Sequence, residues 1–190
     1  MKVLYAIQGT GNGHISRANE IIPILERRVN LDVLVSGKNS SLKLNHPIKY
    51  NFKGISFEFG KKGGIDFWNT LVNINLIQFV RDLKSLKVKD YDLIISDFEP
   101  ISAWACKFYG KECIGLSNQY AMLCPETPKH KNYNFLCALF LKYFCPVSVG
   151  YGIHYQRLGK NIFSPVIKKK LLKIKPKNLS HYTVYLPSYS

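Results

Sequence analysis

Six residues near the start of the chain combine backbone freedom with a titratable side chain. The string GTGNGH at residues 9–14 follows a short apolar run, Val3 to Ile7, and precedes an amphipathic stretch. Glycines let a backbone turn tightly and approach a ligand closely, because no Cβ atoms stand in the way. A helix that starts after such a turn offers unpaired N–H groups to a phosphate or another anion. His14 falls where the turn becomes helix, so an acid–base group is expected at the same place.

The loop departs from the two commonest phosphate-binding patterns. The dinucleotide fingerprint places a third small residue where this chain has His14, and it needs an acidic residue at the end of the second strand, where Ser36 and Gly37 stand. The P-loop needs a lysine after its last glycine, and His14 occupies that place too. We therefore expect no cofactor and no metal. The alternative interpretation is a tight turn that binds no ligand.

The string GTGNGH closely resembles the first glycine loop of the GT-B glycosyltransferases. It is most similar to the group that includes the bacterial cell-wall N-acetylglucosaminyltransferases, with their GGTGGH loop. The longer string GTGNGHISRA resembles a bacterial and archaeal branch of glycosyltransferases. Two further stretches support the resemblance, SDFEP at 96–100 and LSNQ at 116–119, each after a predicted strand. The resemblance covers about residues 1–190, as the first half of such an enzyme.

The resemblance implies an inverting sugar transfer from a nucleotide diphosphate sugar donor to a glycan or glycolipid acceptor, lipid-linked or in the cell envelope. An attacking hydroxyl needs a base to take its proton. In related enzymes a histidine at the start of the first helix, oriented by an acid from a later strand end, can be that base, and His14 and Asp97 match these places. The expected phosphate- and substrate-binding residues are Gly9, Thr10, Gly11, Asn12, Gly13, Arg17, Glu99, Ser117, Asn118 and Gln119.

Each of these side chains has a structural alternative. His14 could cap the helix or brace the loop. Asp97 could be the N-cap of a helix that begins near Pro100, a common role for aspartate. Glu99 and Gln119 are expected to contact acceptor hydroxyls.

Strand-like and helix-like segments alternate along the chain. A near-continuous apolar run at 91–96 is typical of a central parallel strand buried on both faces. This alternation predicts an α/β, Rossmann-like doubly wound and mainly parallel sheet flanked by helices. The other expected strands are 2–8, 31–36, 113–116 and 147–151, with extended pieces at 48–52 and 55–59, a flexible loop at 60–64, and helices at 15–28, 67–86 and 100–110.

Two domain regions are expected. Residues 1–165 form the Rossmann-like, acceptor-side domain. Residues 166–190 contain a basic stretch and a strand at 182–186, which match the inter-domain linker and the first strand of a C-terminal nucleotide-sugar-binding domain in the resembling enzymes. We therefore expect a fragment, a truncated gene product or half of a split enzyme, incomplete and inactive alone.

Composition narrows the partners and the compartment. The net charge of +15 indicates attraction to an anionic surface or simple solvation. The segment at 133–144 is almost wholly apolar, too short to span a bilayer, and reads either as a buried helix or as a membrane-interface segment. No nucleic-acid motif is present, so we expect no nucleic acid partner. Five cysteines without a C-x-x-C pair indicate reduced thiols. We expect a cytoplasmic protein, peripheral on the inner face of the plasma membrane.

Three functions remain open from the sequence. The first is the acceptor-binding half of an inverting glycosyltransferase. The second is a sugar-nucleotide epimerase of the same fold, which would also use a glycine loop and carboxylates. The third is a non-catalytic partner that recruits a separate catalytic half to a membrane.

Overall fold

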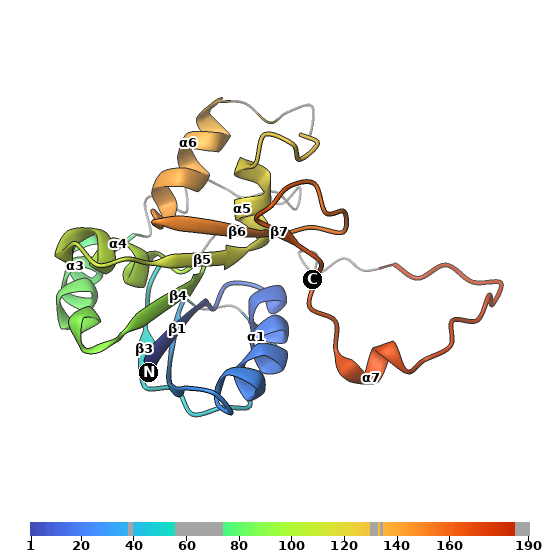
Figure 1. Cartoon of the computed structure of the whole chain (residues 1–190), viewed down its shortest axis with the longest axis horizontal. Helices are drawn as coiled ribbons and strands as arrows, with labels where there is room; N and C mark the ends of the chain where they lie inside the picture. The colour runs from blue at the N-terminus through green and yellow to red at the C-terminus, as the bar shows by residue number, and fades with distance from the viewer. Residues whose placement is uncertain (38–39, 56–73, 130–132, 134, 185–190) are drawn as a thin grey trace.

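The computed structural model describes residues 1–37, 40–55, 74–129, 133 and 135–184. Within these residues the chain forms one seven-stranded sheet of order β3-β2-β1-β4-β5-β6-β7, and every neighbouring pair is parallel (Figure 1). The predicted α/β fold class is confirmed. The strands are β1 Lys2–Gln8, β2 Asn30–Ser36, β3 Tyr50–Phe52, β4 Leu93–Asp97, β5 Ile114–Ser117, β6 Val149–Ile153 and β7 Ile162–Phe163.

Helices flank the sheet on both faces. They are α1 Asn12–Leu25, α3 Leu76–Ser85, α4 Pro100–Tyr109, α5 Asn118–Leu123, α6 Phe135–Phe144 and α7 Lys169–Leu172, with a 3₁₀ turn at Val88–Asp90. Alternate residues of β1 enter two separate cores. Leu4 and Ala6 join one cluster, whereas Tyr5 and Ile7 pack with α1 in the other. Burial on both faces explains the unbroken apolar run of this strand.

The order of the strands reverses between β1 and β4. The chain proceeds outward through β2 and β3, and then returns to place β4 on the other side of β1. In register, Ile7 of β1 lies beside Asp97 of β4. In doubly wound sheets the crevice for a ligand opens at the carboxyl ends of the strands at such a reversal. The glycine loop follows β1 and therefore lies at this crevice.

The boundaries of several elements differ from the sequence predictions. Helix α1 begins at Asn12, three residues earlier than predicted, and ends at Leu25 with Pro23 inside it. The helix predicted at 67–86 begins, in the described part, only at Leu76, because the Asn75 side chain accepts a hydrogen bond from the Gln78 N–H at 2.9 Å and caps it. Residues 67–73 of that helix, the 60–64 loop and most of the 55–59 piece lie outside the described residues. Helix α5 and strand β7 were not predicted.

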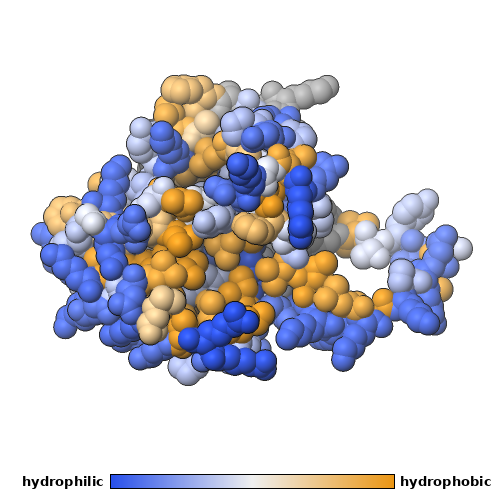
Figure 2. Space-filling model, viewed as in Figure 1, coloured by the Kyte–Doolittle hydropathy of each residue, from blue (hydrophilic) through white to orange (hydrophobic). Residues whose placement is uncertain are grey.

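The predicted strand at 182–186 is not formed by the residues that the structure describes. Residues 182–184 lie in no strand, and 185–186 are outside the described part. The whole segment 173–184 is exposed and loops away from the sheet (Figure 1), so no strand is beside it to pair with. Figure 2 shows hydrophilic and apolar residues mixed along this segment and the residues just before it. Leu172 and Ile174 are both exposed there.

Residues 135–144 of the segment predicted at 133–144 form helix α6. Leu141 and Phe144 are buried, whereas Phe135 and Leu136 are exposed. The end of the helix therefore packs into the core, and contact of its exposed start with a membrane stays a prediction. Among the described residues no helix is long and apolar enough to cross a membrane.

Two glycines of the loop provide a matched test of its packing. A Cβ at Gly9 would lie 2.9 Å from the carbonyl oxygen of Gly37 and 3.0 Å from that of Ser36, whereas one at Gly13 would meet nothing within 4 Å. Gly9→Ala should therefore destabilise the protein by about 1–3 kcal/mol, the usual cost of overpacking. Gly13→Ala should change the free energy of unfolding by no more than about 0.5 kcal/mol. Urea unfolding measures both, and equal stabilities would show that the β1–β2 approach tolerates a side chain.

Candidate active site at the glycine loop

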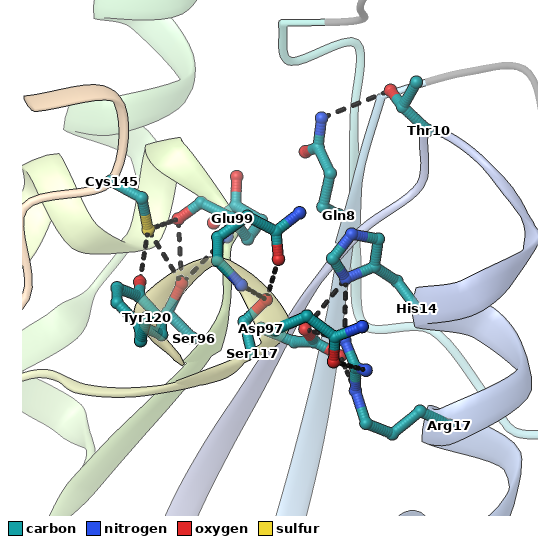
Figure 3. Close-up of polar contacts among 12 residues, drawn as sticks. Gln8, Thr10, His14, Arg17, Ser96, Asp97, Glu99, Ser117, Tyr120 and Cys145 are labelled. Carbon is teal, nitrogen blue, oxygen red and sulfur yellow. Dashed lines mark hydrogen bonds and ion pairs between the residues drawn. The ribbon is translucent and has the colours of Figure 1, made fainter. Parts of the chain in front are cut away.

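The structure brings His14 and Asp97 into contact. His14 lies in the first turn of α1, and Asp97 is the last residue of β4. His14 Nδ1 is 2.8 Å from Asp97 Oδ1 (Figure 3). The carboxylate is fully buried, and the imidazole retains 13% exposure. The pair therefore joins a buried charge to a partly accessible acid–base group.

Arg17 makes a two-pronged ion pair with the same carboxylate. It lies one helical turn after His14, so both side chains project from one face of α1. Arg17 Nη2 donates to Asp97 Oδ1 at 2.6 Å, and Arg17 Nε donates to Asp97 Oδ2 at 2.9 Å. Its remaining terminal nitrogen, Nη1, donates to Asn118 Oδ1 at 3.1 Å. The guanidinium thus connects α1, the end of β4 and the start of α5.

These contacts fix the tautomer of the imidazole. If Nδ1 carried no proton, its lone pair would face the lone pairs of a carboxylate at 2.8 Å. The proton therefore resides on Nδ1 and is donated to Asp97. Arg17 Nη2 also lies 3.1 Å from the same nitrogen, but the contact of Nδ1 with the carboxylate is shorter and decides the assignment. In the neutral ring, Nε2 on the side away from Asp97 is left free to accept a proton.

The burial of these groups shapes their ionisation. Burial disfavours the charged form of Asp97, but the nearby His14 and Arg17 outweigh it and hold the pKa of Asp97 below its ordinary value. Tyr5 OH donates to Asp97 Oδ2 at 3.4 Å, and burial, followed by the Asp97 charge, raises the pKa of Tyr5 well above its usual value. Asp97 is therefore a carboxylate, and Tyr5 a neutral donor, at neutral pH.

A strained residue separates Asp97 from Glu99. Phe98 has φ of 56°, a left-handed conformation that costs a non-glycine residue on the order of 1–2 kcal/mol. Its ring is buried, stacked on Phe144 with centroids 5.0 Å apart and edge-on to Tyr120 at 6.0 Å. This packing holds the turn, which directs Asp97 toward α1 and Glu99 toward α4. The sequence analysis did not identify this feature, because nothing in the string SDFEP marks a phenylalanine for positive φ.

Glu99, expected to contact acceptor hydroxyls, is instead fully buried and caps α4. Its two carboxylate oxygens accept from the N–H groups of Ile101 and Ser102 at 2.8 and 2.7 Å, and one also accepts from Ser36 Oγ at 2.5 Å. Burial raises the pKa of Glu99, although the hydrogen bonds from Ser36, Ser102 and Ile101 act in the opposite direction. The capping role proposed as an alternative for Asp97 thus belongs to Glu99. Pro100 begins the helix and Gly110, with φ of 66°, ends it, as predicted.

Of the other predicted loop residues, Asn12 and Thr10 make hydrogen bonds within the protein, and Gly11 precedes a helix start without a side-chain cap. Asn12 Oδ1 accepts from the N–H groups of Ser41 and Leu42 at 3.0 and 3.2 Å, so its side chain braces the segment after β2. Thr10 is buried and accepts from Gln8 Nε2 at 3.2 Å. Gly11 has φ of 82°, and no described side chain caps α1 behind it. The first N–H groups of α1 are therefore not engaged by such a cap.

The residues after β5 lie on the other side of Arg17. Ser117 is the buried N-cap of α5, and its hydroxyl contacts Gln119 Oε1. Asn118 is held by Arg17, as described above. The three predicted polar clusters, at the ends of β1, β4 and β5, therefore lie at one edge of the sheet.

A cleft of about 430 Å³ opens beside these groups. Gly13 and Arg17 of α1 and Asn118 of α5 contribute to one part of its lining. The other contributors, notably Thr127, His154 and Tyr155, carried no signal in the sequence. Thr127 is 5% exposed, and its hydroxyl has no hydrogen-bond partner among the residues that the structure describes. A buried polar group without a partner is unusual and marks a place where a ligand hydroxyl could bind.

The described residues contain no cluster of three or more His, Cys, Asp or Glu side chains placed to hold a metal ion. The part of the chain that the structure describes contains no disulfide bond. The groups available for chemistry at this edge are thus an imidazole, an ion-paired carboxylate, helix N–H groups and hydroxyls.

The comparison with known families agrees with this arrangement. The model of the family described as glycosyl transferase family 1 matches residues 1–190. The chain therefore belongs to glycosyl transferase family 1. A search of the curated proteins gives no match.

Two solved structures are similar at low identity. One is the crystal structure of a UDP-N-acetylglucosamine 2-epimerase, with a TM-score of 0.43 and 10% identity, covering 80% of this chain and 41% of that chain. The other is the crystal structure of MurG from Acinetobacter baumannii, with a TM-score of 0.46 and 14% identity, covering 89% of this chain and 44% of that chain. This chain spans less than half the length of either.

Acid should weaken the contribution of Asp97 to stability. Because the pKa of Asp97 is lowered in the folded state, its contribution is fully present above the unfolded value of about 3.9 and is lost as pH falls through the folded value. The stability difference between the wild type and Asp97→Asn should therefore be large at pH 6 and shrink below about pH 4. Urea unfolding at several pH values measures it. A difference that stays constant would mean that ionised Asp97 contributes nothing.

The buried cap gives a second stability test. Glu99→Ala removes the acceptor for two helix N–H groups and leaves the Ser36 hydroxyl buried without this partner. The loss should be about 2 kcal/mol, from the cap and the unsatisfied hydroxyl together. The exposed Glu112→Ala is the control and should stay within about 0.5 kcal/mol of the wild type. Equal effects of the two substitutions in urea unfolding would contradict the capping role.

Proposed function

We propose that residues 1–190 are the acceptor-side half of an inverting glycosyltransferase that moves a sugar from a nucleotide diphosphate sugar to a glycan or glycolipid acceptor. The observation that carries the proposal is the His14–Asp97 pair in a chain of glycosyl transferase family 1. The residue before His14, Gly13, and its partner Arg17 both line the cleft. Membership of the family supports the transfer of a sugar, and the pair supports a base at the place where the acceptor would bind.

The proposed reaction is a single displacement. An acceptor hydroxyl oxygen attacks the anomeric carbon while Nε2 of His14 takes the hydroxyl proton. The bond from the anomeric carbon to the diphosphate oxygen breaks, and the diphosphate leaves with the electron pair from the opposite face, so the configuration inverts. Asp97 faces the Nδ1–H of the imidazolium that forms. The N–H groups at the start of α1 are suited to stabilise the negative charge on the departing group.

The cleft is proposed as the acceptor site. Asn118 offers an amide, and Thr127 offers a hydroxyl to which no described residue is hydrogen-bonded; both can bind sugar hydroxyls. Tyr155 is 87% exposed at the same cleft and offers a ring face. Because Arg17 is already engaged by Asp97 and Asn118, we assign it the role of positioning His14 and Asn118 rather than of holding a phosphate.

The donor is proposed to bind mainly through a second half of the enzyme. In the enzymes that the sequence resembles, most donor contacts come from such a nucleotide-sugar-binding half. We accordingly propose that residues 1–165 are the acceptor-side domain and that residues 166–190 are the connecting region. We further propose that residues 1–190 alone do not catalyse sugar transfer. If the enzyme changed the configuration of the sugar while the sugar stayed on its nucleotide, the epimerase alternative would be favoured.

A location at the inner face of the plasma membrane is also a proposal. Phe135 and Leu136 are 74% and 71% exposed at the start of α6, and exposed Lys129 precedes them in the chain. Figure 2 shows apolar residues over α6 at the top of the molecule. Exposed apolar side chains beside basic ones suit the interface of an anionic bilayer.

Removal of the proposed base tests the mechanism in the complete enzyme, with this chain joined to or mixed with its second half. His14→Ala should lower kcat by about 10²- to 10⁴-fold, the usual contribution of a positioned base. Asp97→Asn should lower kcat less than His14→Ala, because the base itself remains, although the variant also loses the stabilising ion pair with Arg17. His181→Ala, an exposed histidine far along the chain, should leave kcat unchanged. If His14→Ala raised KM alone, His14 would be a binding residue and not the base.

A further inference from the structure

A second cavity, of about 290 Å³, lies at the opposite edge of the sheet from the glycine loop. Its walls come from the last turns of α4 and α6 and from the loops that enter β5 and β6. Because the strands are parallel, these entering loops are at the amino ends of the strands, away from His14 and Asp97. The cavity is therefore separate from the proposed active site and has no part in the chemistry described above.

Three lysines converge on this cavity. Lys107 belongs to the last turn of α4, Lys142 to the last turn of α6, and Lys111 to the loop before β5. The Nζ atoms of Lys107 and Lys142 both lie 5.8 Å from the ring centroid of Tyr143. Two ammonium groups on one aromatic ring repel each other, and the ring attracts each of them only weakly. Their arrangement leaves a concentration of positive charge at one place.

No carboxylate lines this cavity among the described residues; the nearest in the chain is the exposed Glu112, beside Lys111. The described lining contains no Asp or Glu, and the ion pairs found within the described ranges involve none of the three lysines. The carbonyl ends of α4 and α6 do attract cations, but a helix end carries only about half an elementary charge. Two such ends balance about one of the three lysines. The cavity therefore stays positive and has room for an anion.

The remaining polar group of the cavity can also donate. Ser148 Oγ accepts a hydrogen bond from the Cys113 N–H at 3.1 Å, which leaves the hydroxyl hydrogen of Ser148 available. Three ammonium groups and one hydroxyl are a donor set for the oxygens of a phosphate. Tyr143 and Phe108, both exposed and on the same two helices, provide apolar surface beside it.

We propose that this lysine cavity, lined by Lys107, Lys111, Lys142, Tyr143 and Ser148, is a binding site for a phosphate group. The phosphate could belong to the headgroup of an anionic lipid or to a soluble phosphorylated compound, since both present the same oxygens. The site is independent of the proposed glycosyl transfer, because neither His14 nor Asp97 contributes to it.

The first test uses inorganic phosphate as the probe and the full chain as the protein. Titration at low ionic strength, followed by ¹H–¹⁵N NMR, should shift the backbone amides of residues around the cavity, Lys111 and Ser148 among them. The triple variant Lys107→Ala, Lys111→Ala, Lys142→Ala should bind phosphate at least tenfold more weakly. The matched control is Lys168→Ala, Lys169→Ala, Lys170→Ala, which removes the same charge from the exposed segment around α7 and should bind as the wild type does.

A second arm distinguishes the two sources of phosphate. Co-sedimentation with phosphatidylglycerol vesicles should be lost in the cavity variant and kept in the control if the ligand is a lipid headgroup, with neutral phosphatidylcholine vesicles binding neither. If the ligand is soluble, the NMR titration distinguishes the two variants and the vesicles do not. Either result supports the site. Equal weakening of phosphate binding in both triple variants, or no shift around the cavity, would overturn it, because the charge would then act only diffusely.

Discussion

A buried ion pair between Arg17 and Asp97 connects the parts on which the candidate site depends. Both groups are almost without contact with water, so their charges are stable only together. Removing one partner of such a pair usually costs about 3–5 kcal/mol, because the other charge is left buried. This constraint holds α1 against the end of β4 in one position, and it brings His14 to the same carboxylate. The geometry of the imidazole is therefore a consequence of a structural interaction.

The turn after β4 supports that pair at an energetic cost. Phe98 adopts a conformation that phenylalanine rarely takes, and aromatic packing against Phe144 and Tyr120 holds it there. The strained turn lets the two acids that flank Phe98, Asp97 and Glu99, point in different directions and differ in their pKa values. Asp97 is held charged by its cations, whereas burial makes the charge of Glu99 unfavourable. Asp97 thereby holds His14 and Arg17, and Glu99 caps α4.

The two edges of the sheet differ in chemistry. Within the described residues, the carboxyl edge gathers an oriented imidazole, a carboxylate, the start of α1 without a side-chain cap and a cleft with an unpartnered hydroxyl. The amino edge gathers lysines around a smaller cavity. Membership of glycosyl transferase family 1 fits the first set, since sugar transfer needs a base and stabilisation of a leaving anion. The second set offers positive charge without a paired imidazole and carboxylate, which suits the binding of an anion.

The parallel α/β fold and the positions of His14 and Asp97 at the ends of strands could be predicted from the sequence. Local signals were sufficient there, because apolar periodicity, glycines and the Pro100 to Gly110 limits of α4 act within a few residues. The tertiary structure alone decided that Glu99, rather than Asp97, caps α4, and that Arg17 binds Asp97. It also decided that segments 120 residues and more after the loop complete the cleft with His154 and Tyr155. The positive φ of Phe98 and the absence of a strand at 182–184 were likewise decided by the tertiary structure. These outcomes depend on which neighbours are present to pack or to pair, and such contacts between distant residues leave no signal in the local sequence.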